Sequence, residues 1–227
     1  MKLKYLLLMC LVVGCVTSAE SQVFIGGRFG GRFGGGARYG YGSPRPRPNS
    51  PKKSQPKFKP VVIVSVGYGF PNLDKLQMPD YFNYYKGTAS QSGPFTGAID
   101  YQFNPTTSIG LLVTHGTVNM PYYSYNNPTS PSLNGALDNW SYMINFVRYI
   151  PASKAVTPYI RTAIGINSWS QNFTDGSGNN VYPPVALPDL AYQIGIGAKF
   201  NVSKNTGFFV EGGYGKYILH GGLSFKF

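Results

Sequence analysis

The 227-residue sequence is poor in cysteine and histidine, and each shortage excludes a class of chemistry. The two cysteines, Cys10 and Cys15, both lie close to the amino terminus. Removal of that segment would leave no thiol for a disulfide, a cysteine-based metal site or a cysteine nucleophile. With only two histidines in addition, the sequence offers no recognisable cluster of metal ligands. We therefore expect neither a metal nor another cofactor.

Long apolar runs are also missing. No run reaches the roughly 18 residues that a transmembrane helix needs, which excludes membrane-spanning helices. The longest, residues 5–16, follows a short basic start and precedes a small, polar stretch ending at Ser21. This order predicts a secretory signal peptide at residues 1–21, with Gln22 as the first mature residue. An alternative interpretation takes residues 12–15 as a lipoprotein box, in which Cys15 is acylated.

Acidic residues are scarce, with 8 Asp and Glu against 20 Lys and Arg and a formal net charge of +12. The excess belongs to residues 22–60, which combine Gly, Arg, Pro, Lys and aromatic residues without any acid. Such a composition cannot bury a core and predicts a disordered basic segment. It suits a solvated linker, or a strap that docks on an anionic envelope component or a protein partner. RNA binding would be the interpretation in a cytosolic protein, but behind a signal peptide we expect no nucleic-acid partner.

Residues 61–227 alternate between apolar and polar positions in eight segments, and this period of two predicts β-strands. The predicted strands cover residues 61–70, 93–104, 108–118, 140–150, 157–168, 189–201, 206–215 and 217–227. Connections between them alternate between long and short. The long ones are predicted at residues 71–92, 119–139 and 171–188.

The sizes of the side chains predict which face of each strand points outward. The interior of a barrel of about eight strands has little more room than its own side chains fill. The apolar face carries large groups such as Ile194, Val210 and Leu223, whereas the other face carries mainly Gly, Ser, Ala and Gln. We therefore expect the apolar face to point into lipid. The predicted fold is all-β: an eight-stranded antiparallel up-and-down transmembrane β-barrel.

Aromatic residues near the strand ends fit the interfacial belts of such a barrel. The predicted belt residues are Tyr68, Phe70, Trp140, Tyr142, Trp169 and Tyr214 at one rim, and Tyr101, Phe103, Tyr149, Phe200, Phe208 and Phe227 at the other.

The chain ends in alternating apolar residues and a final aromatic, Leu223, Phe225 and Phe227. With this ending, residues 61–227 resemble Gram-negative outer-membrane β-barrel proteins, most closely the eight-stranded OmpA/OmpX-like transmembrane barrels. The resemblance implies an outer-membrane location with both mature termini in the periplasm. It also implies recognition of the terminal strand by the barrel-insertion machinery, and contact with membrane lipid and lipopolysaccharide.

Charged residues on the inward face predict a polar cluster in the lumen. Its predicted members are Asp100, Arg161, Glu211, Lys199, His220 and Lys226. We expect Arg161 to pair with Glu211 and Asp100 at one depth, because an unpaired buried charge costs several kcal/mol. Lys199 and Lys226 are expected near the rim. The cluster could be a structural plug, or a gate for a narrow ion or water path.

Catalysis requires a base, a nucleophile and an orienting acid close together. His115 with Thr117, and His220 with Glu211, are the candidates for a lipid A-modifying enzyme of this shape. No acid is predicted beside His115 on the outward face, and His220 is predicted to pack in the lumen. We therefore expect no catalytic residues. The expected function is structural or interactive: an anchor that displays Tyr- and Asn-rich loops outside and a basic tail in the periplasm.

Overall fold

The computed structural model describes residues 58–153, 155–181 and 185–227, all within one compact unit, residues 54–227. The predicted signal peptide and residues 22–57 of the predicted basic tail lie outside the described residues. Among the described residues, no helix is long and apolar enough to cross a membrane.

The described residues form a nine-stranded antiparallel sheet with one 3-10 helix, η2 (Leu73–Gln77). The strands are β1 (Val61–Asn72), β2 (Tyr84–Lys86), β3 (Ser90–Asn104), β4 (Thr107–Ser124), β5 (Leu133–Tyr149), β6 (Val156–Asp175), β7 (Leu190–Asn201), β8 (Thr206–Tyr214) and β9 (Tyr217–Lys226).

Eight of these strands close into a ring. Each pairs with its neighbour in chain order, the β4–β5 pairing is part of the ring, and β9 returns to pair with β1. The seam between first and last strands is continuous to the end, because Phe227 N–H donates to the Val62 carbonyl at 2.8 Å. This arrangement confirms the predicted eight-stranded antiparallel up-and-down barrel. The ninth strand, β2, lies outside the ring and pairs only with β4.

The two ends of the barrel differ in their connections. At the end where Val61 and Phe227 lie, called here the terminal end, the strands are joined by residues 105–106, 150–155 and 202–205. At the opposite end, called the loop end, η2 and β2 lie in the connection from β1 to β3, and residues 176–189 join β6 to β7. The alternation of long and short connections is therefore present, as predicted.

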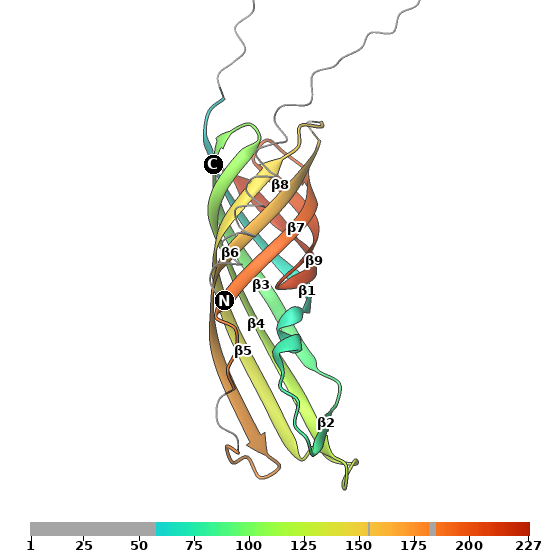
Figure 1. The fold of residues 1–227 in the computed structure, drawn as a ribbon. Helices are drawn as coiled ribbons and strands as arrows, with labels where there is room; N and C mark the ends of the chain where they lie inside the picture. The colour runs from blue at the N-terminus through green and yellow to red at the C-terminus, as the bar shows by residue number, and fades with distance from the viewer. Residues whose placement is uncertain (1–57, 154, 182–184) are drawn as a thin grey trace, which may run out of the picture. The chain divides into compact units, whose positions relative to one another are not determined.

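The predicted long loops, however, are wrong in extent. β4 continues to Ser124 and β5 begins at Leu133, so most of the predicted 119–139 loop is a paired hairpin. β6 pairs with β7 as far as Ile166 and then continues for nine more residues to Asp175. Figure 1 shows β4, β5 and β6 continuing past the other barrel strands, with β2 alongside β4. We call this part, residues 73–89, 117–139 and 167–188 where described, the extension.

The extension has a hydrophobic core of its own, and this core explains why its strands persist beyond the barrel. Its buried members are Met78, Val118, Met120, Tyr122, Leu133, Leu137 and Phe173. The chain segment after η2 covers this core, and Tyr122 O–H donates to the Pro79 carbonyl at 2.9 Å. Burial raises the pKa of the Tyr122 hydroxyl above its usual value. Two further buried clusters, centred on Phe209 and on Met143, fill the barrel lumen.

Truncation of the extension core should loosen the extension without opening the barrel. Leu137 is 2% exposed, so Leu137→Ala is expected to cost about 2–5 kcal/mol locally. In hydrogen-exchange mass spectrometry, peptides covering residues 117–124, 133–139 and 167–175 should exchange faster, whereas those of β7, β8 and β9 should not.

The matched control is Leu76→Ala, because Leu76 lies at the same end of the barrel but is 61% exposed. That variant should exchange like the unmodified chain. Faster exchange throughout the barrel in Leu137→Ala would show that the extension is not an independent structural unit.

Candidate functional site

Large apolar side chains surround the barrel on its outward face. Every ring strand contributes an exposed one: Val66, Ile99, Leu111, Ile144, Ile164, Ile196, Val210 and Leu223. Leu111 is 61% exposed and Ile196 is 68% exposed, whereas the lumen residues Arg161 and Glu211 are 5% and 1% exposed. The orientation predicted from side-chain size is therefore the one that the structure has. We call this outward surface the apolar belt.

Aromatic rings flank the apolar belt near both ends, with two exceptions to the predicted set. Tyr149 is buried and points into the lumen, where it meets Tyr159 edge-on with ring centroids 6.3 Å apart. Trp169 packs against the extension core, and its indole N–H donates to the Pro188 carbonyl. The remaining predicted belt aromatics lie on outward positions.

Glu211 on β8 is the centre of the hydrogen bonds in the lumen. Tyr159 O–H donates to Glu211 Oε2 at 2.9 Å, and Tyr217 O–H donates to Oε1 at 3.0 Å. Arg161 Nη1 on β6 lies 3.1 Å from the same Oε2. Two hydroxyl donors and one cation therefore stabilise this carboxylate away from water.

Glycines make room for these lumen side chains. A Cβ added at Gly195 would stand 2.6 Å from Glu211 Oε1, and one at Gly67 would stand 2.5 Å from His220 Nε2. Such distances are too short for van der Waals contact, so larger residues at Gly195 or Gly67 would displace Glu211 or His220.

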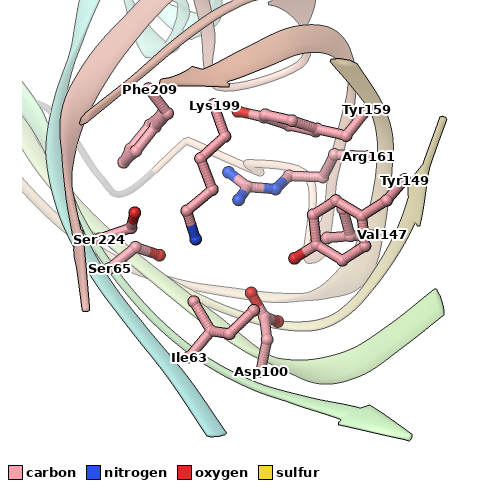
Figure 2. A pocket seen from close by; sticks show the side chains of 10 residues that line it. All are labelled: Ile63, Ser65, Asp100, Val147, Tyr149, Tyr159, Arg161, Lys199, Phe209 and Ser224. Atoms are coloured by element: carbon pink, nitrogen blue, oxygen red, sulfur yellow. The ribbon is translucent and has the colours of Figure 1, made fainter. Parts of the chain in front are cut away.

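Asp100, Arg161 and Lys199 line one cavity in the lumen, as Figure 2 shows. The structure gives Asp100 a different partner from the predicted one, because Asn145 Nδ2 donates to its Oδ1 at 2.7 Å. Asp100 still lines the same cavity as Arg161. Lys199 lies two residues before the end of β7, near the terminal rim, and its 6% exposed side chain extends into the lumen.

The remaining predicted residues lie on the last strand, β9. His220 is buried, its Nε2 is 2.6 Å from Thr96 Oγ1, and its ring packs on Tyr217. Lys226 is half-buried at the terminal end. Of the predicted insertion signal, Leu223 and Phe227 are exposed on the outward face and Phe225 is half-buried.

A second buried ion pair lies at the loop end and was not predicted from the sequence. Lys216 Nζ, in the turn between β8 and β9, lies 2.8 Å from Asp74 Oδ1 in η2. Asn139 Nδ2 donates to Asp74 Oδ2 at 3.0 Å, and the Lys216 ammonium stands 5.2 Å from the centroid of Trp169. Burial lowers the pKa of Lys216, and the Asp74 carboxylate opposes that shift. We call Asp74, Lys216 and Asn139 the mouth cluster.

The sequence carried no periodic signal for the mouth cluster. Asp74 lies in an irregular connection, and Lys216 lies in a turn, so alternation assigns neither of them a face.

In the 176–189 connection, the backbone N–H of Asn179 donates to the Asp175 carboxylate and lowers the pKa of that carboxyl.

His115 does have a carboxylate beside it, contrary to the prediction. Asp138 Oδ1 lies 3.9 Å from His115 Nδ1, because Asp138 sits two residues before Trp140, the partner of His115 across the β4–β5 ladder. His115 stacks on Trp140, with ring centroids 4.3 Å apart. At 3.9 Å the two groups are too far apart for a hydrogen bond, so the geometry does not orient His115 as a base.

Tyrosines gather on the surface of the extension. Tyr85 of β2 stacks on Tyr123 with ring centroids 5.5 Å apart and lies 5.7 Å from Tyr125. Phe82 is 97% exposed next to them in the sequence. These residues belong to the predicted Tyr-rich loops, and the structure holds several of them on paired strands.

No family model and no curated protein matches this chain. Similar solved structures include Ail, the attachment invasion locus protein of Yersinia pestis, in complex with the heparin analogue sucrose octasulfate, at 14% identity and a TM-score of 0.42. That match covers 74% of this chain and 97% of Ail. The N-terminal β-barrel domain of Pseudomonas aeruginosa OprF is similar at 14% identity and a TM-score of 0.36, over 74% and 97% of the two chains. A de novo designed transmembrane β-barrel is similar at 17% identity and a TM-score of 0.39, over 74% and 95%.

Two Asp–Lys ion pairs with the same nitrogen–oxygen distance but different burial allow a matched test of the mouth cluster. Asp74–Lys216 and Asp80–Lys86 are each 2.8 Å apart, but the Asp74 side chain is 9% exposed and that of Asp80 is 95% exposed. Asp74→Asn should cost about 3–5 kcal/mol, because it leaves Lys216 buried and unpaired. Asp80→Asn should cost about 0–1 kcal/mol.

Urea unfolding of the purified protein in detergent micelles, followed by tryptophan fluorescence, measures both costs. The double variant Asp74→Asn/Lys216→Met should be more stable than Asp74→Asn, since it removes the uncompensated charge. Equal costs for the two single variants would contradict a structural role for the mouth cluster.

Proposed function

We propose that this protein is an outer-membrane β-barrel of structural and interaction type, which anchors the extension at a bacterial cell surface. The single observation that carries the proposal is the apolar belt, in which every ring strand presents a large exposed apolar side chain. Soluble monomers rarely expose contiguous apolar patches larger than a few hundred Å². Such a surface around a whole barrel is stable only against lipid.

Strand length supports the same proposal. A tilted transmembrane strand needs about 9–11 residues. The shortest ring strands, β8 and β9, have 9 and 10 residues, and the longer ones exceed the span only at the loop end. Closure of the ring also leaves the barrel without an unpaired edge at membrane depth, which a lipid environment requires.

The orientation follows from the connections. Outer-membrane barrels have short periplasmic turns and longer external connections. We infer that the terminal end faces the periplasm and that the extension faces outward, beyond the membrane. Residues 22–60 would then emerge into the periplasm behind a cleaved signal peptide, where their positive charge suits an anionic or protein partner.

A closed lumen favours an anchor over a channel. The Arg161–Glu211 pair and its tyrosines lie inside the barrel, and the mouth cluster, whose Asp74 belongs to η2, lies at the loop end. An eight-stranded barrel has little interior beyond what its side chains fill. The lumen polar residues therefore act as a plug in this proposal, and the narrow channel is the alternative that conductance would reveal.

The extension is the part suited to recognition. Tyrosines among small polar residues suit contacts with proteins, glycans or lipopolysaccharide head groups, because each ring offers a rigid apolar face and a hydroxyl. Because they lie on paired strands over the core that contains Tyr122 and Phe173, they would lose little conformational entropy on binding a partner.

The two native tryptophans test the membrane assignment. With Trp169→Phe, the remaining Trp140 is 43% exposed on the apolar belt, and brominated acyl chains in lipid vesicles should quench its fluorescence strongly. With Trp140→Phe, the remaining Trp169 packs against the extension core and should be quenched much less. A third variant, Val210→Trp in a background without native tryptophan, should be quenched most.

Cell fractionation accompanies this measurement, and the protein should sediment with outer membranes and change gel mobility on heating. Absence of quenching at both Trp140 and Val210→Trp would reject the membrane assignment, since both positions then meet water or protein.

Planar-bilayer recording separates the plug from the channel. The unmodified protein should give no steady openings, whereas Arg161→Ser/Glu211→Ser should give small openings because it removes the ion pair that helps to fill the lumen. Lys204→Ser, in the short turn between β7 and β8, is the control and should stay silent. Steady openings of the unmodified protein, changed in size by Arg161→Ser, would favour the channel.

A further inference from the structure

A small cavity lies in the terminal half of the lumen, and its lining is unusual in its supply of hydrogen-bond donors. Its volume is about 20 Å³. The polar groups around it come from Ser65, Asp100, Tyr149, Tyr159, Arg161, Lys199 and Ser224. A cavity needs roughly 10–15 Å³ to hold one water, so a single small species fits.

Arg161 supplies two donors that the rest of the lumen does not use. The side chain is buried, and neither its Nε nor its Nη1 has a hydrogen-bond partner among the described residues. Nη1 stands 3.1 Å from Glu211 Oε2, in ion-pair range, but it does not direct a hydrogen at that oxygen. Buried donors of this kind are costly unless another group accepts from them.

Lys199 brings a second cation to the same space. Figure 2 shows its ammonium group pointing into the cavity between the Arg161 guanidinium and the Ser65 and Ser224 hydroxyls, with the Asp100 carboxylate across from it. Lys199 is 6% exposed, so solvent does little to compensate its charge.

The carboxylates of the lumen are already engaged. Glu211 accepts hydrogen bonds from Tyr159 and Tyr217 and lies beside Arg161, and Asp100 accepts one from Asn145. With Lys226 half-buried at the terminal end, the predicted lumen cluster holds three basic side chains against two carboxylates. One positive charge is left, together with a surplus of donors.

We propose that this cavity binds one halide-sized monovalent anion, held between the Lys199 ammonium and the Arg161 guanidinium. Such an ion accepts charge-assisted hydrogen bonds from both cations and from nearby hydroxyls, and it balances the remaining charge. Phosphate and sulfate are too large for a volume of about 20 Å³. Water alone would accept from the donors but leave the charge uncompensated. This binding site is independent of whether the extension recognises a partner.

Bromide tests the proposal directly, because it replaces chloride and scatters anomalously. Crystals of the full barrel grown or soaked in sodium bromide should show an anomalous peak in the cavity, within about 3.5 Å of Lys199 Nζ and an Arg161 nitrogen. The peak should be absent in Lys199→Met and present in Lys204→Met, which removes a lysine from an exposed turn. A cavity that holds only water, or nothing, in bromide would overturn the proposal.

Thermal unfolding in detergent gives a second readout that does not need crystals. At constant ionic strength, replacement of isethionate by chloride or bromide should raise the unfolding midpoint of the unmodified protein, since a ligand of the folded state stabilises it. Lys204→Met should respond equally, and Lys199→Met should lose the halide-specific increase. An identical midpoint in isethionate, chloride and bromide for the unmodified protein would contradict the site.

Discussion

In a closed ring of strands, every side chain points either into the lumen or away from the barrel, because successive residues of a strand alternate between its two faces. This barrel places its bulky apolar residues outside and its charges inside. The inward charges are stable only because they meet one another and the lumen hydroxyls, as Arg161, Glu211 and Tyr159 do. The apolar belt and the filled lumen are thus two consequences of one orientation.

The two buried ion pairs lie in different parts of the lumen. Arg161–Glu211 connects β6 to β8 inside the barrel, and Asp74–Lys216 connects η2 to the turn between β8 and β9 at the loop end. Both pairs join elements that are far apart in the chain, so each constrains the barrel as well as filling it. Removal of one partner would leave a buried charge, which gives these contacts more effect on stability than exposed pairs such as Asp80–Lys86.

The extension is stabilised by different contacts from those of the barrel. Beyond the barrel β4 no longer pairs with β3 and β6 no longer pairs with β7, and an isolated hairpin is marginally stable in water. Here β4, β5 and β6 remain paired with one another, and the segments after η2 and around Val185 cover one face. The core around Tyr122 and Phe173 replaces the stabilisation that barrel closure gives elsewhere. A surface for recognition can therefore stand beyond the barrel on a firm support.

The sequence by itself determined the barrel: its strand count, the inward or outward face of positions such as Val210 and Glu211, and the asymmetry of its two ends. It could do so because alternation is a local property of the chain: successive side chains point to opposite faces of a strand, whichever strand it pairs with. The tertiary structure decided what alternation cannot encode. Asp74 and Lys216 form an ion pair although 142 residues separate them in the chain. The β4–β5 register brings Asp138 beside His115. At Asp100, the partner is Asn145 instead of the predicted Arg161. Residues 119–124 and 133–139 had been predicted as loop because proline and asparagine interrupt the pattern, but burial around Phe173 outweighs that local preference.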